Sequence, residues 1–388
     1  MQSILLRLHD TFTFFVTTTM IALMSKQAYH GGAFFNAIGN DFSTLENSTK
    51  VISADVLDAW FDPSPKVIEK IREYLSFALK TSPPTHCEGL IRTISEQRDI
   101  PQENIIVGSG SSNLIFAFFP HVVKKGDKVL ILDPMYGEYS HILEDVINVE
   151  LFRHALDKER DFVLDYDLLT KNITQVNPVM AVLVNPNSPT GQYWDRENIL
   201  TLAKTFSDVT FVVDEAYIDY VGGEKTVERD VAKHPNLVVI KSMSKVYGLS
   251  GVRLAYLTAP VSIIERIFQF IPPWPVSLVA QIAGVEALKD KKYYLRKYAE
   301  TKSLREGMMQ DLQMPSVKIF NSVANFFLVN LTGAGLSARN IVEELRKKNI
   351  YLRNCDSISK QFHDDFIRIA VKDKTTNIIV TDALKKLL

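Results

Sequence analysis

The sequence has little cysteine and almost no net charge. Among its 388 residues only Cys87 and Cys355 are cysteines, and neither lies in a Cys-x-x-Cys motif or a Cys/His cluster. Two thiols cannot form a disulfide framework for a chain of this length, and their surroundings predict no metal site. The net charge of −1 provides no basic field that would attract nucleic acid or an anionic membrane. We therefore expect small molecules as partners, and no nucleic acid, membrane or metal.

The sequence also lacks a hydrophobic run long enough to span a bilayer. Residues 11–24 (TFTFFVTTTMIALM) form an apolar run, but it is shorter than the roughly twenty residues that a spanning helix needs. A signal peptide would require a basic flank and a small-residue cleavage site, whereas the sequence offers only Arg7 and no such site. We expect residues 1–27 to be a poorly ordered leader, or the result of an upstream start with Met20 or Met24 as the natural beginning. The rest of the chain is typical of a cytoplasmic protein.

Short apolar runs alternate with longer amphipathic stretches between residues 103 and 258. The stretches at 112–123 and 195–206 have the length and periodicity of helices. Most of the short runs are continuously apolar, which is typical of strands covered by helices on both faces. This alternation predicts an α/β domain with a mostly parallel, doubly wound sheet. The predicted strands are residues 104–107, 128–132, 180–184, 210–213, 237–240 and 252–257.

The pattern changes after about residue 275, where single strands separate helices. A long helical stretch at 277–310 is followed by a strand at 324–330, a helix at 338–348, a strand at 366–371 and a helix at 377–388. This order predicts a smaller α+β domain. We place the large domain at residues 53–285 and the small domain at 286–388. Residues 28–52 are expected to join the small domain and the active site.

Two residues at predicted strand ends indicate chemistry. Asp214 ends the apolar run Phe-Val-Val-Asp, where a buried carboxylate is unfavourable unless it meets a cation or hydrogen-bond donors. A protonated pyridine nitrogen is such a partner, and fixing that proton makes the ring an electron sink. Lys245 follows the next predicted strand, 31 residues later. A lysine whose pKa is lowered in a desolvated site is a nucleophile for aldehydes.

A second group of residues indicates a phosphate site. The run Val-Gly-Ser-Gly-Ser-Ser-Asn at 107–113 leads from a strand through glycines into a helix, whose first backbone N–H groups can bind an anion. Its spacing is neither a dinucleotide motif nor a P-loop. Ser242, Ser244 and Arg253 add hydroxyl donors and a planar cation suited to a phosphate dianion.

Two more segments lie at predicted strand ends. Tyr136 offers an aromatic face after the strand that begins at residue 128, and a turn-rich segment, Asn-Pro-Asn-Ser-Pro-Thr-Gly, occupies 185–191. Taken singly, they are a core aromatic and a tight turn. In parallel sheets, however, strand ends meet at one edge, where ligands bind. The motifs in this order therefore predict one shared site.

This set of motifs resembles the fold-type I pyridoxal-5′-phosphate (PLP) enzymes of the class I/II aminotransferases, and most closely the histidinol-phosphate aminotransferase family. The similarity runs from about Asp62 to the C-terminus. The strongest marks are Asp214-Glu-Ala-Tyr217 and the segment from Ser242-Met-Ser-Lys245 to Arg253. Further marks are Pro273-Trp-Pro-Val-Ser277, Ser322-Val-Ala-Asn325-Phe and Phe366-Ile-Arg368-Ile.

The resemblance implies a role for each matching residue. Lys245 resembles the Schiff-base lysine and proton shuttle, Asp214 the partner of the pyridine nitrogen, and Tyr217 the donor to the phenolic oxygen of the cofactor. Tyr136 resembles the residue that stacks on the cofactor ring. The implied phosphate cup consists of Gly110, Ser111, Ser112, Ser242, Ser244 and Arg253.

The resemblance also implies substrate contacts and an assembly. Arg368 matches the arginine that holds the anionic group of the substrate, and Arg353 is implied as a second one. Tyr29 lies in the segment that covers the substrate in the family, although here the segment reads Tyr-His-Gly-Gly at 29–32. Family members place the active site at a dimer interface, so the resemblance implies a homodimer.

Two departures from the family concern cofactor contacts. Ser188 occupies the position of an asparagine that donates to the phenolic oxygen, so that a water or Asn187 would have to replace this donor. A tyrosine that reaches the phosphate from the neighbouring subunit is replaced by Ser82-Pro-Pro. That contact is lost, or Thr81 or Ser82 takes it over.

The third departure lies where the substrate should enter. The family's Asn-Glu-Asn-Pro segment is replaced by Asp-Val-Leu-Asp-Ala-Trp-Phe-Asp-Pro at residues 55–63. One interpretation is a solvated loop with Trp60 packed beneath it. The other is a pocket in which Asp58 and Trp60 hold a cationic side chain by charge-assisted bonds and stacking, joined by Glu88 and His30.

The sequence therefore predicts a PLP-dependent aminotransferase that acts on an amino acid or amino alcohol, with a 2-oxo acid as second substrate. The departures leave two alternatives open. One is a PLP-dependent cyclase or dehydratase acting on a guanidino amino acid such as hydroxyarginine. The other is a decarboxylase of the threonine-phosphate type. A ligand sensor in a transcription regulator would need an added DNA-binding module, for which the leader is too short and too apolar.

Overall fold

Seven strands form the larger of two sheets, in the order β2-β8-β7-β6-β5-β3-β4. The computed structural model describes residues 31–39 and 41–388. Strand β8 runs antiparallel to both of its neighbours, and the other pairs in this sheet are parallel. The strands are β2 (Ile105–Gly108), β3 (Lys128–Asp133), β4 (Glu150–Ala155), β5 (Met180–Val184), β6 (Thr210–Asp214), β7 (Leu237–Ser242) and β8 (Ala255–Thr258).

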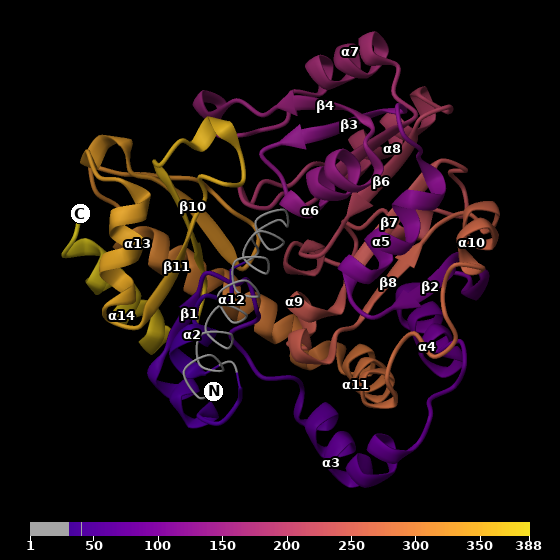
Figure 1. The fold of residues 1–388 in the computed structure, drawn as a ribbon, viewed down its shortest axis with the longest axis horizontal. Coiled ribbons are helices and arrows are strands. Elements are labelled where there is room, and N and C mark those ends of the chain that lie inside the picture. Colours follow the sequence, from indigo (N-terminus) through magenta and orange to yellow (C-terminus); the bar gives the residue numbers. More distant parts are fainter. Residues whose placement is uncertain (1–30, 40) are drawn as a thin grey trace, which may run out of the picture. The chain divides into compact units, whose positions relative to one another are not determined.

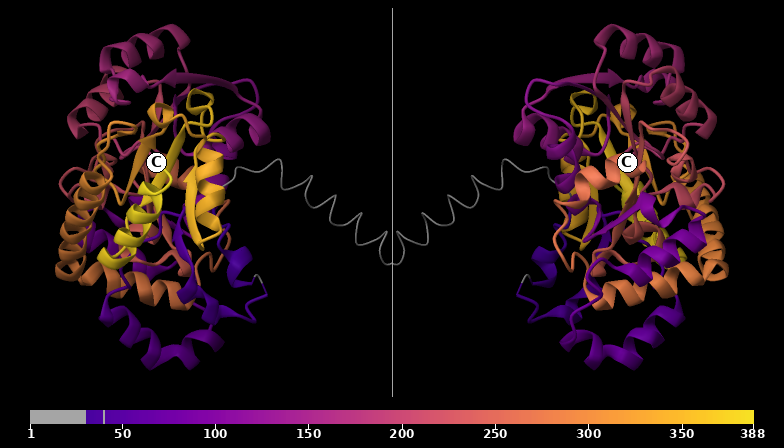
Figure 2. Two further views of the ribbon diagram at one scale, coloured as in Figure 1. Left: turned by 90° about the vertical axis from the view of Figure 1, so that its left-hand side faces the viewer. Right: turned by 90° about the vertical axis from the view of Figure 1, so that its right-hand side faces the viewer.

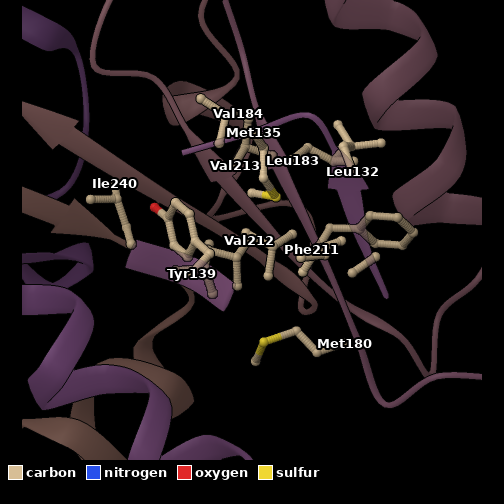
Figure 3. Packing of buried hydrophobic residues seen from close by; sticks show 14 of the residues in the cluster. Leu132, Met135, Tyr139, Met180, Leu183, Val184, Phe211, Val212, Val213 and Ile240 are labelled. Carbon is tan, nitrogen blue, oxygen red and sulfur yellow. The ribbon is translucent and has the colours of Figure 1, made fainter. Parts of the chain in front are cut away.

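The central strands are buried on both faces. Every residue of β5 and β7 is buried, as are Phe211, Val212 and Val213 of β6. Consecutive side chains of a strand point to opposite faces, so both faces of the sheet must be covered. Complete burial of one such side chain stabilises the fold by about 1.5–3 kcal/mol. Figure 3 shows part of this core, with Tyr139 and side chains of β5, β6 and β7 drawn as sticks.

Helices between Pro65 and Lys289 accompany the large sheet (Figure 1). Polar side chains begin several of them: Ser64 accepts a bond from the N–H of Lys66, and Ser277 from that of Ala280. The helices are α3 (Pro65–Lys80), α4 (Glu88–Arg98), α5 (Ser111–Val122), α6 (Gly137–Ser140), α7 (Tyr166–Val176), α8 (Arg196–Thr205), α9 (Met243–Tyr247), α10 (Val261–Phe268) and α11 (Leu278–Lys289).

The second sheet has five strands in the order β1-β11-β12-β10-β9. Its first strand, β1, comes from the N-terminal part of the chain and pairs in parallel with β11, which lies about 300 residues later. The left-hand view of Figure 2 shows the C-terminal helix α14 on the outer side of this sheet. The strands are β1 (Ile52–Ala54), β9 (Lys318–Ile319), β10 (Phe326–Asn330), β11 (Ile350–Asn354) and β12 (Phe366–Ala370), and the helices are α2 (Phe35–Ile38), α12 (Lys291–Asp311), α13 (Ala338–Arg346) and α14 (Lys374–Lys385).

Among the residues that the structure describes, no helix combines the length and the apolar character of a membrane span.

Short 3-10 or π-helical segments connect the helices and strands. The connecting segments are η1 (Leu45–Lys50), η2 (Gln102–Asn104), η3 (His141–Ile147), η4 (Lys158–Arg160), η5 (Ile218–Tyr220), η6 (Glu228–Asp230), η7 (Ser250–Val252), η8 (Thr332–Ala334) and η9 (Lys360–Phe362).

The predicted fold class is confirmed: a large, mostly parallel sheet with helices is combined with a smaller α+β part. The helical stretch expected at 277–310 consists of two helices, because the chain turns at Asp290 between α11 and α12. The predicted domain boundary at 285/286 falls inside α11, and residues 31–388 form one compact unit. The boundary therefore stays a prediction. The expected leader at 1–27 lies outside the described residues.

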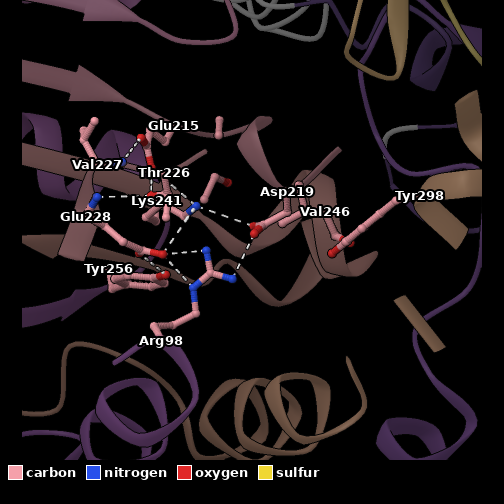
Figure 4. Close-up of polar contacts among 12 residues, drawn as sticks. Arg98, Glu215, Asp219, Thr226, Val227, Glu228, Lys241, Val246, Tyr256 and Tyr298 are labelled. Carbon is pink, nitrogen blue, oxygen red and sulfur yellow. Dashed lines mark hydrogen bonds and ion pairs between the residues drawn. The ribbon is translucent and has the colours of Figure 1, made fainter. Parts of the chain in front are cut away.

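Five buried charges form a network beside the ends of β6 and β7 (Figure 4). Arg98 lies 2.9 Å from Asp219, and its Nε donates to Glu228 at 2.7 Å. Lys241 Nζ lies 3.5 Å from Asp219 and 3.6 Å from Glu215. Because burial outweighs the attraction of Lys241, the pKa of Glu215 is raised to about 7. The network fixes β6 and β7 to α4, next to the residues predicted to form the site.

Replacing Arg98 by methionine should lower the free energy of unfolding by about 3–5 kcal/mol, because Asp219 and Glu228 would each lose the nearer of two cations inside the protein. Urea denaturation measures this change. Lys70→Met is the matched control, since Lys70 forms an exposed ion pair with Glu73 at 3.2 Å, worth less than about 1 kcal/mol. Equal losses for the two variants would contradict the importance of the network.

Candidate active site

The strand register brings the predicted motifs to one edge of the large sheet. Asp214 at the end of β6 lies beside Val184 of β5 and Ile240 of β7. Ala255 of β8 pairs with both Ser242 of β7 and Gly108 of β2. The carboxyl ends of β2, β5, β6 and β7 therefore meet at the edge where α/β sheets bind ligands.

Asp214 is a buried carboxylate whose two oxygens each accept a hydrogen bond. The hydroxyl of Tyr139 donates to Oδ2 at 2.8 Å, and the backbone N–H of Ala216 donates to Oδ1 at 3.0 Å. Burial raises the pKa of Asp214, and these two bonds oppose the rise. The charge thus has neutral donors but lacks a hydrogen-bonded cation among the described residues. A protonated ring nitrogen would supply one.

Lys245 lies in α9, three residues after the end of β7. Its Nζ donates to Oδ1 of Asp58 at 2.7 Å, and the hydroxyl of Ser250 donates to the same oxygen at 2.6 Å. Burial alone would raise the pKa of Asp58, but Lys245 and Ser250 hold it below its usual value. The loop at 55–58 therefore reaches the predicted nucleophile directly.

The two predicted tyrosines also lie near this edge. Tyr136 immediately precedes α6, and its hydroxyl bonds to Ser112 at the start of α5; burial raises the pKa of Tyr136 to about 12. Tyr217 is 7% exposed and packs edge-on against Phe326 of β10 at 5.1 Å between ring centroids. Burial raises the pKa of Tyr217, while the charge of Arg368 opposes the rise. Both hydroxyls therefore stay protonated donors at neutral pH.

The start of α5 and the guanidinium of Arg253 lie together at one corner of the site. Gly110 precedes the helix with φ +91°, and a Cβ built on it would meet the Arg253 guanidinium at 2.6 Å. Glycine thus allows the guanidinium to lie beside the first N–H groups of a twelve-residue helix. Ser111 and Ser112 are its first two residues, while Ser242 caps α9 by accepting from the N–H of Ser244 at 3.3 Å. These features suit a phosphate dianion.

The two predicted substrate arginines lie side by side on neighbouring strands of the small sheet. Arg368 of β12 pairs with Arg353 of β11, and both are buried. Arg368 donates to Ser188 Oγ and to the backbone oxygen of Asp55, at 3.1 Å each. Its Nε is buried and has no acceptor among the described residues. Such an unsatisfied donor on a cation suits an anionic ligand.

The turn at 185–191 is held in place by hydrogen bonds of the Asn187 side chain. The side chain of Asn187 donates to the backbone oxygen of Pro134 at 3.2 Å and accepts from the hydroxyl of Thr190 at 2.9 Å. Gly191 has φ +74°, and a Cβ there would approach Ser322 Cα to 3.0 Å. With its amide engaged inside the protein, Asn187 offers little to replace a missing donor. The hydroxyl oxygen of Ser188 accepts a hydrogen bond from Arg368.

Trp60 is engaged by helix α12. Its indole N–H donates to Thr301 at 2.8 Å, and Lys297 lies over the ring at 4.3 Å from the centroid. Packing beneath the loop is thus the arrangement that the structure shows for Trp60. The carboxylate of Glu88 accepts a hydrogen bond from the backbone N–H of His86 at 3.3 Å. Tyr29 and His30 lie outside the described residues.

Three side chains at the site have no counterpart in the sequence-based prediction. They are Tyr139, which bonds Asp214, Ser250, which bonds Asp58, and Lys372, which lies just after β12 and interacts electrostatically with Asp58 and Lys245. Tyr139 follows Tyr136 by three residues, the spacing of one helical face, and this was the available signal. The other two contacts depend on tertiary packing.

The sequence of this chain is similar to those of known proteins. Residues 53–384 match the family model described as aminotransferase class I and II. The chain is a member of this family. Histidinol-phosphate aminotransferase of Methanococcoides burtonii is 31% identical over 322 residues, which are 83% of this chain and 86% of that protein.

Solved structures share the fold of this chain. The histidinol-phosphate aminotransferase of Clostridium acetobutylicum has a TM-score of 0.79 at 24% identity, with 87% of this chain and 99% of that chain covered. The enzyme of Sinorhizobium meliloti, solved in complex with PLP, has a TM-score of 0.79 at 19% identity, covering 94% and 97%. As a class I and II aminotransferase, this chain is a PLP-dependent enzyme of the transaminase type. The buried carboxylate, the lysine and the glycine-lined corner described above fit this cofactor.

Replacing Tyr139 by phenylalanine should weaken PLP binding. The variant removes one of the two hydrogen bonds that hold Asp214, and a bond to a charged group contributes about 1.5–3 kcal/mol. We expect the dissociation constant of PLP to rise about ten- to hundredfold, measured by absorbance titration of the cofactor-free protein. Tyr166→Phe is the control, because Tyr166 begins α7 and is not one of the two donors to the Asp214 carboxylate. An unchanged constant in Tyr139→Phe would contradict a role in holding Asp214.

Proposed function

We propose that the enzyme transfers the amino group of an amino acid or amino alcohol to a 2-oxo acid, and that Lys245 moves the proton. The observation that carries the proposal is the position of Lys245, one strand away from Asp214 at the carboxyl edge of the sheet. Bound PLP supplies an aldehyde and a protonated ring that withdraws electrons. An amine held at this place reaches the carbon whose proton must be removed.

Other residues hold and orient the reacting molecules. Asp214, oriented by Tyr139, would keep a proton on the ring nitrogen. Tyr217, a protonated phenol, would donate to the phenolic oxygen, and Tyr136 would stack on the ring. The corner formed by Arg253 and the start of α5 would hold the phosphate, together with Ser242 and Ser244. Arg368 and Arg353 bind the anionic group of the substrate, for which the unsatisfied Nε of Arg368 supplies a donor.

A second candidate reaction has one observation in its favour. The carboxylate of Asp58 lies beside Lys245, where it would attract a substrate with a positively charged side chain, such as a guanidino amino acid. A leaving group on such a side chain would permit elimination and ring closure in place of transfer. The packing of Trp60 against α12 removes the predicted indole wall from this pocket, so transfer remains the first choice.

Holoenzyme mixed with an amino substrate, in the absence of a 2-oxo acid, should convert its bound PLP to the pyridoxamine form. Absorbance and chromatography of the released cofactor measure the conversion. Compounds with phosphate, neutral and guanidino side chains test the substrate class. Lys245→Ala should lower the rate by at least about 10²-fold, since general acid–base groups contribute 10²–10⁴-fold. Release of ammonia or carbon dioxide without conversion would overturn transamination.

We also infer a homodimer. Helix α3 exposes several apolar side chains, among them Phe77 at 51% and Leu79 at 71%. Large apolar side chains gathered on one helix are typical of an interface, and the partner must be a second copy if the family arrangement holds.

Leu79→Glu should therefore shift the protein from dimer to monomer, because the interface would have to bury an unpaired charge. Sedimentation velocity measures the change. Ile378→Glu on α14, where the side chain is 46% exposed, is the control. A monomeric unmodified protein would contradict the inference.

A further inference from the structure

A cavity of about 190 Å³ lies between α4, α9, α11 and α12, beside the network of buried charges. Figure 4 shows three of the residues that line it, namely Arg98, Asp219 and Tyr298. Among the described residues, none of those predicted to bind PLP or the substrate contributes to the lining. The cavity is therefore distinct from the candidate active site.

The walls of the cavity are mostly apolar and aromatic. Leu288 of α11 and Leu295 of α12 line it together with three tyrosines. The rings of Tyr247 and Tyr294 pack edge to face, with 4.9 Å between their centroids. A cavity of about 150 Å³ holds benzene, so this larger one accepts a ligand body of the size of one aromatic ring. Aromatic walls favour such a ring through edge-on or offset packing.

The hydroxyl of Tyr247 is a donor without an acceptor at this cavity. Tyr247 lines the cavity and is only 8% exposed, yet its hydroxyl forms no hydrogen bond with the described residues. Only its backbone oxygen is engaged, accepting from the hydroxyl of Tyr294 at 3.2 Å. A buried phenol usually has a hydrogen-bond partner. A ligand oxygen at the inner end of the cavity would supply the missing acceptor.

Positive charge outweighs negative charge around the cavity. Its lining carries three cations, Arg98, Arg229 and Lys291, and one carboxylate, Asp219. Arg98 lies 2.9 Å from Asp219, so these two charges offset each other. Arg229 and Lys291 are exposed, and neither forms an ion pair with a carboxylate of the described residues; the Nε of Arg229 donates to the backbone oxygen of Arg98 at 2.9 Å. The open side of the cavity therefore favours an anion.

We propose that this cavity binds a small aromatic carboxylate that carries a second oxygen at the opposite end of its ring. The ring would lie between the apolar walls, and the carboxylate would face Arg229 and Lys291 at the open side. The hydroxyl of Tyr247 would donate to the inner oxygen. Each contact answers one observation, and 4-hydroxybenzoate has all three features.

The bound molecule would contact α9, the helix that carries Lys245. Residues that line the cavity hold this helix by its backbone: the hydroxyl of Tyr298 donates to the oxygen of Val246 at 3.0 Å, and that of Tyr294 to the oxygen of Tyr247 at 3.2 Å. The side chain of Lys245 bonds Asp58, which does not line the cavity. The proposed site therefore adjoins the frame of the active site without sharing its reactive groups.

The test compares three probes of nearly equal size by isothermal titration calorimetry of the full chain with PLP bound. The probes are 4-hydroxybenzoate, benzoate and 4-hydroxybenzamide. Benzoate, which lacks the inner oxygen, should bind about two- to tenfold more weakly than 4-hydroxybenzoate, as expected for one hydrogen bond. 4-Hydroxybenzamide, which lacks the charge, should bind about five- to thirtyfold more weakly, as expected for two partly exposed ion pairs.

Two variants should each remove one of these preferences and keep the other. In Tyr247→Phe, 4-hydroxybenzoate and benzoate should bind equally well, while the preference for the acid over the amide remains. In the double variant Arg229→Gln, Lys291→Gln, the acid and the amide should bind equally well, while the preference for the inner oxygen remains. The matched control is Arg72→Gln, Lys292→Gln, at two exposed positions outside the lining, and it should keep both preferences.

The substrate site is the other place where an aromatic acid can bind. Arg368→Gln tests this alternative, because it removes the cation predicted to hold the anionic group of the substrate. This variant should keep both preferences. Loss of binding in Arg368→Gln, or preferences unchanged in Tyr247→Phe and in the double variant, would overturn the proposal.

The proposal and the proposed function can fail separately. If the preferences change as expected in a protein that does not convert PLP to the pyridoxamine form, the proposed function fails while the second site stands. If the conversion takes place but 4-hydroxybenzoate binds no better than the other two probes, the second site fails.

Discussion

The buried charge of Asp214, which has no hydrogen-bonded cation among the described residues, is the constraint on which the site depends. A carboxylate at the end of a central strand is strongly disfavoured unless donors or a cation answer its charge. Tyr139 and the backbone of Ala216 supply two hydrogen bonds, but neither is a cation. The site therefore favours a ligand that brings a positive charge to this strand end, and a protonated pyridine ring has both the charge and the shape. Binding such a ring would therefore offset part of the cost of burying the Asp214 carboxylate at the end of β6.

The network of buried charges beside β6 and β7 makes this edge of the sheet rigid. Glu215 follows Asp214 and belongs to the network of buried charges, while Lys241 of the same network precedes Ser242. Each strand thus carries a structural charge next to a residue of the site. Because the network joins both strands to α4, the positions of Asp214 and α9 are fixed before any ligand binds. Preorganised charges need little rearrangement when the reaction begins.

The sequence predicted those parts of the molecule whose cause is local. Continuous apolar runs indicated β5, β6 and β7, and strand ends indicated where Asp214 and Lys245 should lie. Strand β4 was missed because it lies at the sheet edge, and its residues are only partly buried, so its apolar pattern is weak. The break at Asp290 was missed because both flanking segments favour helix. The bonds from Lys245 and Ser250 to Asp58 join residues nearly 190 positions apart, and no local pattern encodes them.

The departures that the sequence predicts are connected through Arg368. Ser188, predicted to stand in place of an asparagine, accepts a bond from the arginine, and the loop at 55–63 accepts another through the backbone oxygen of Asp55. The same loop places Asp58 on Lys245. One change in the loop thus reaches both the substrate anchor and the reactive amine.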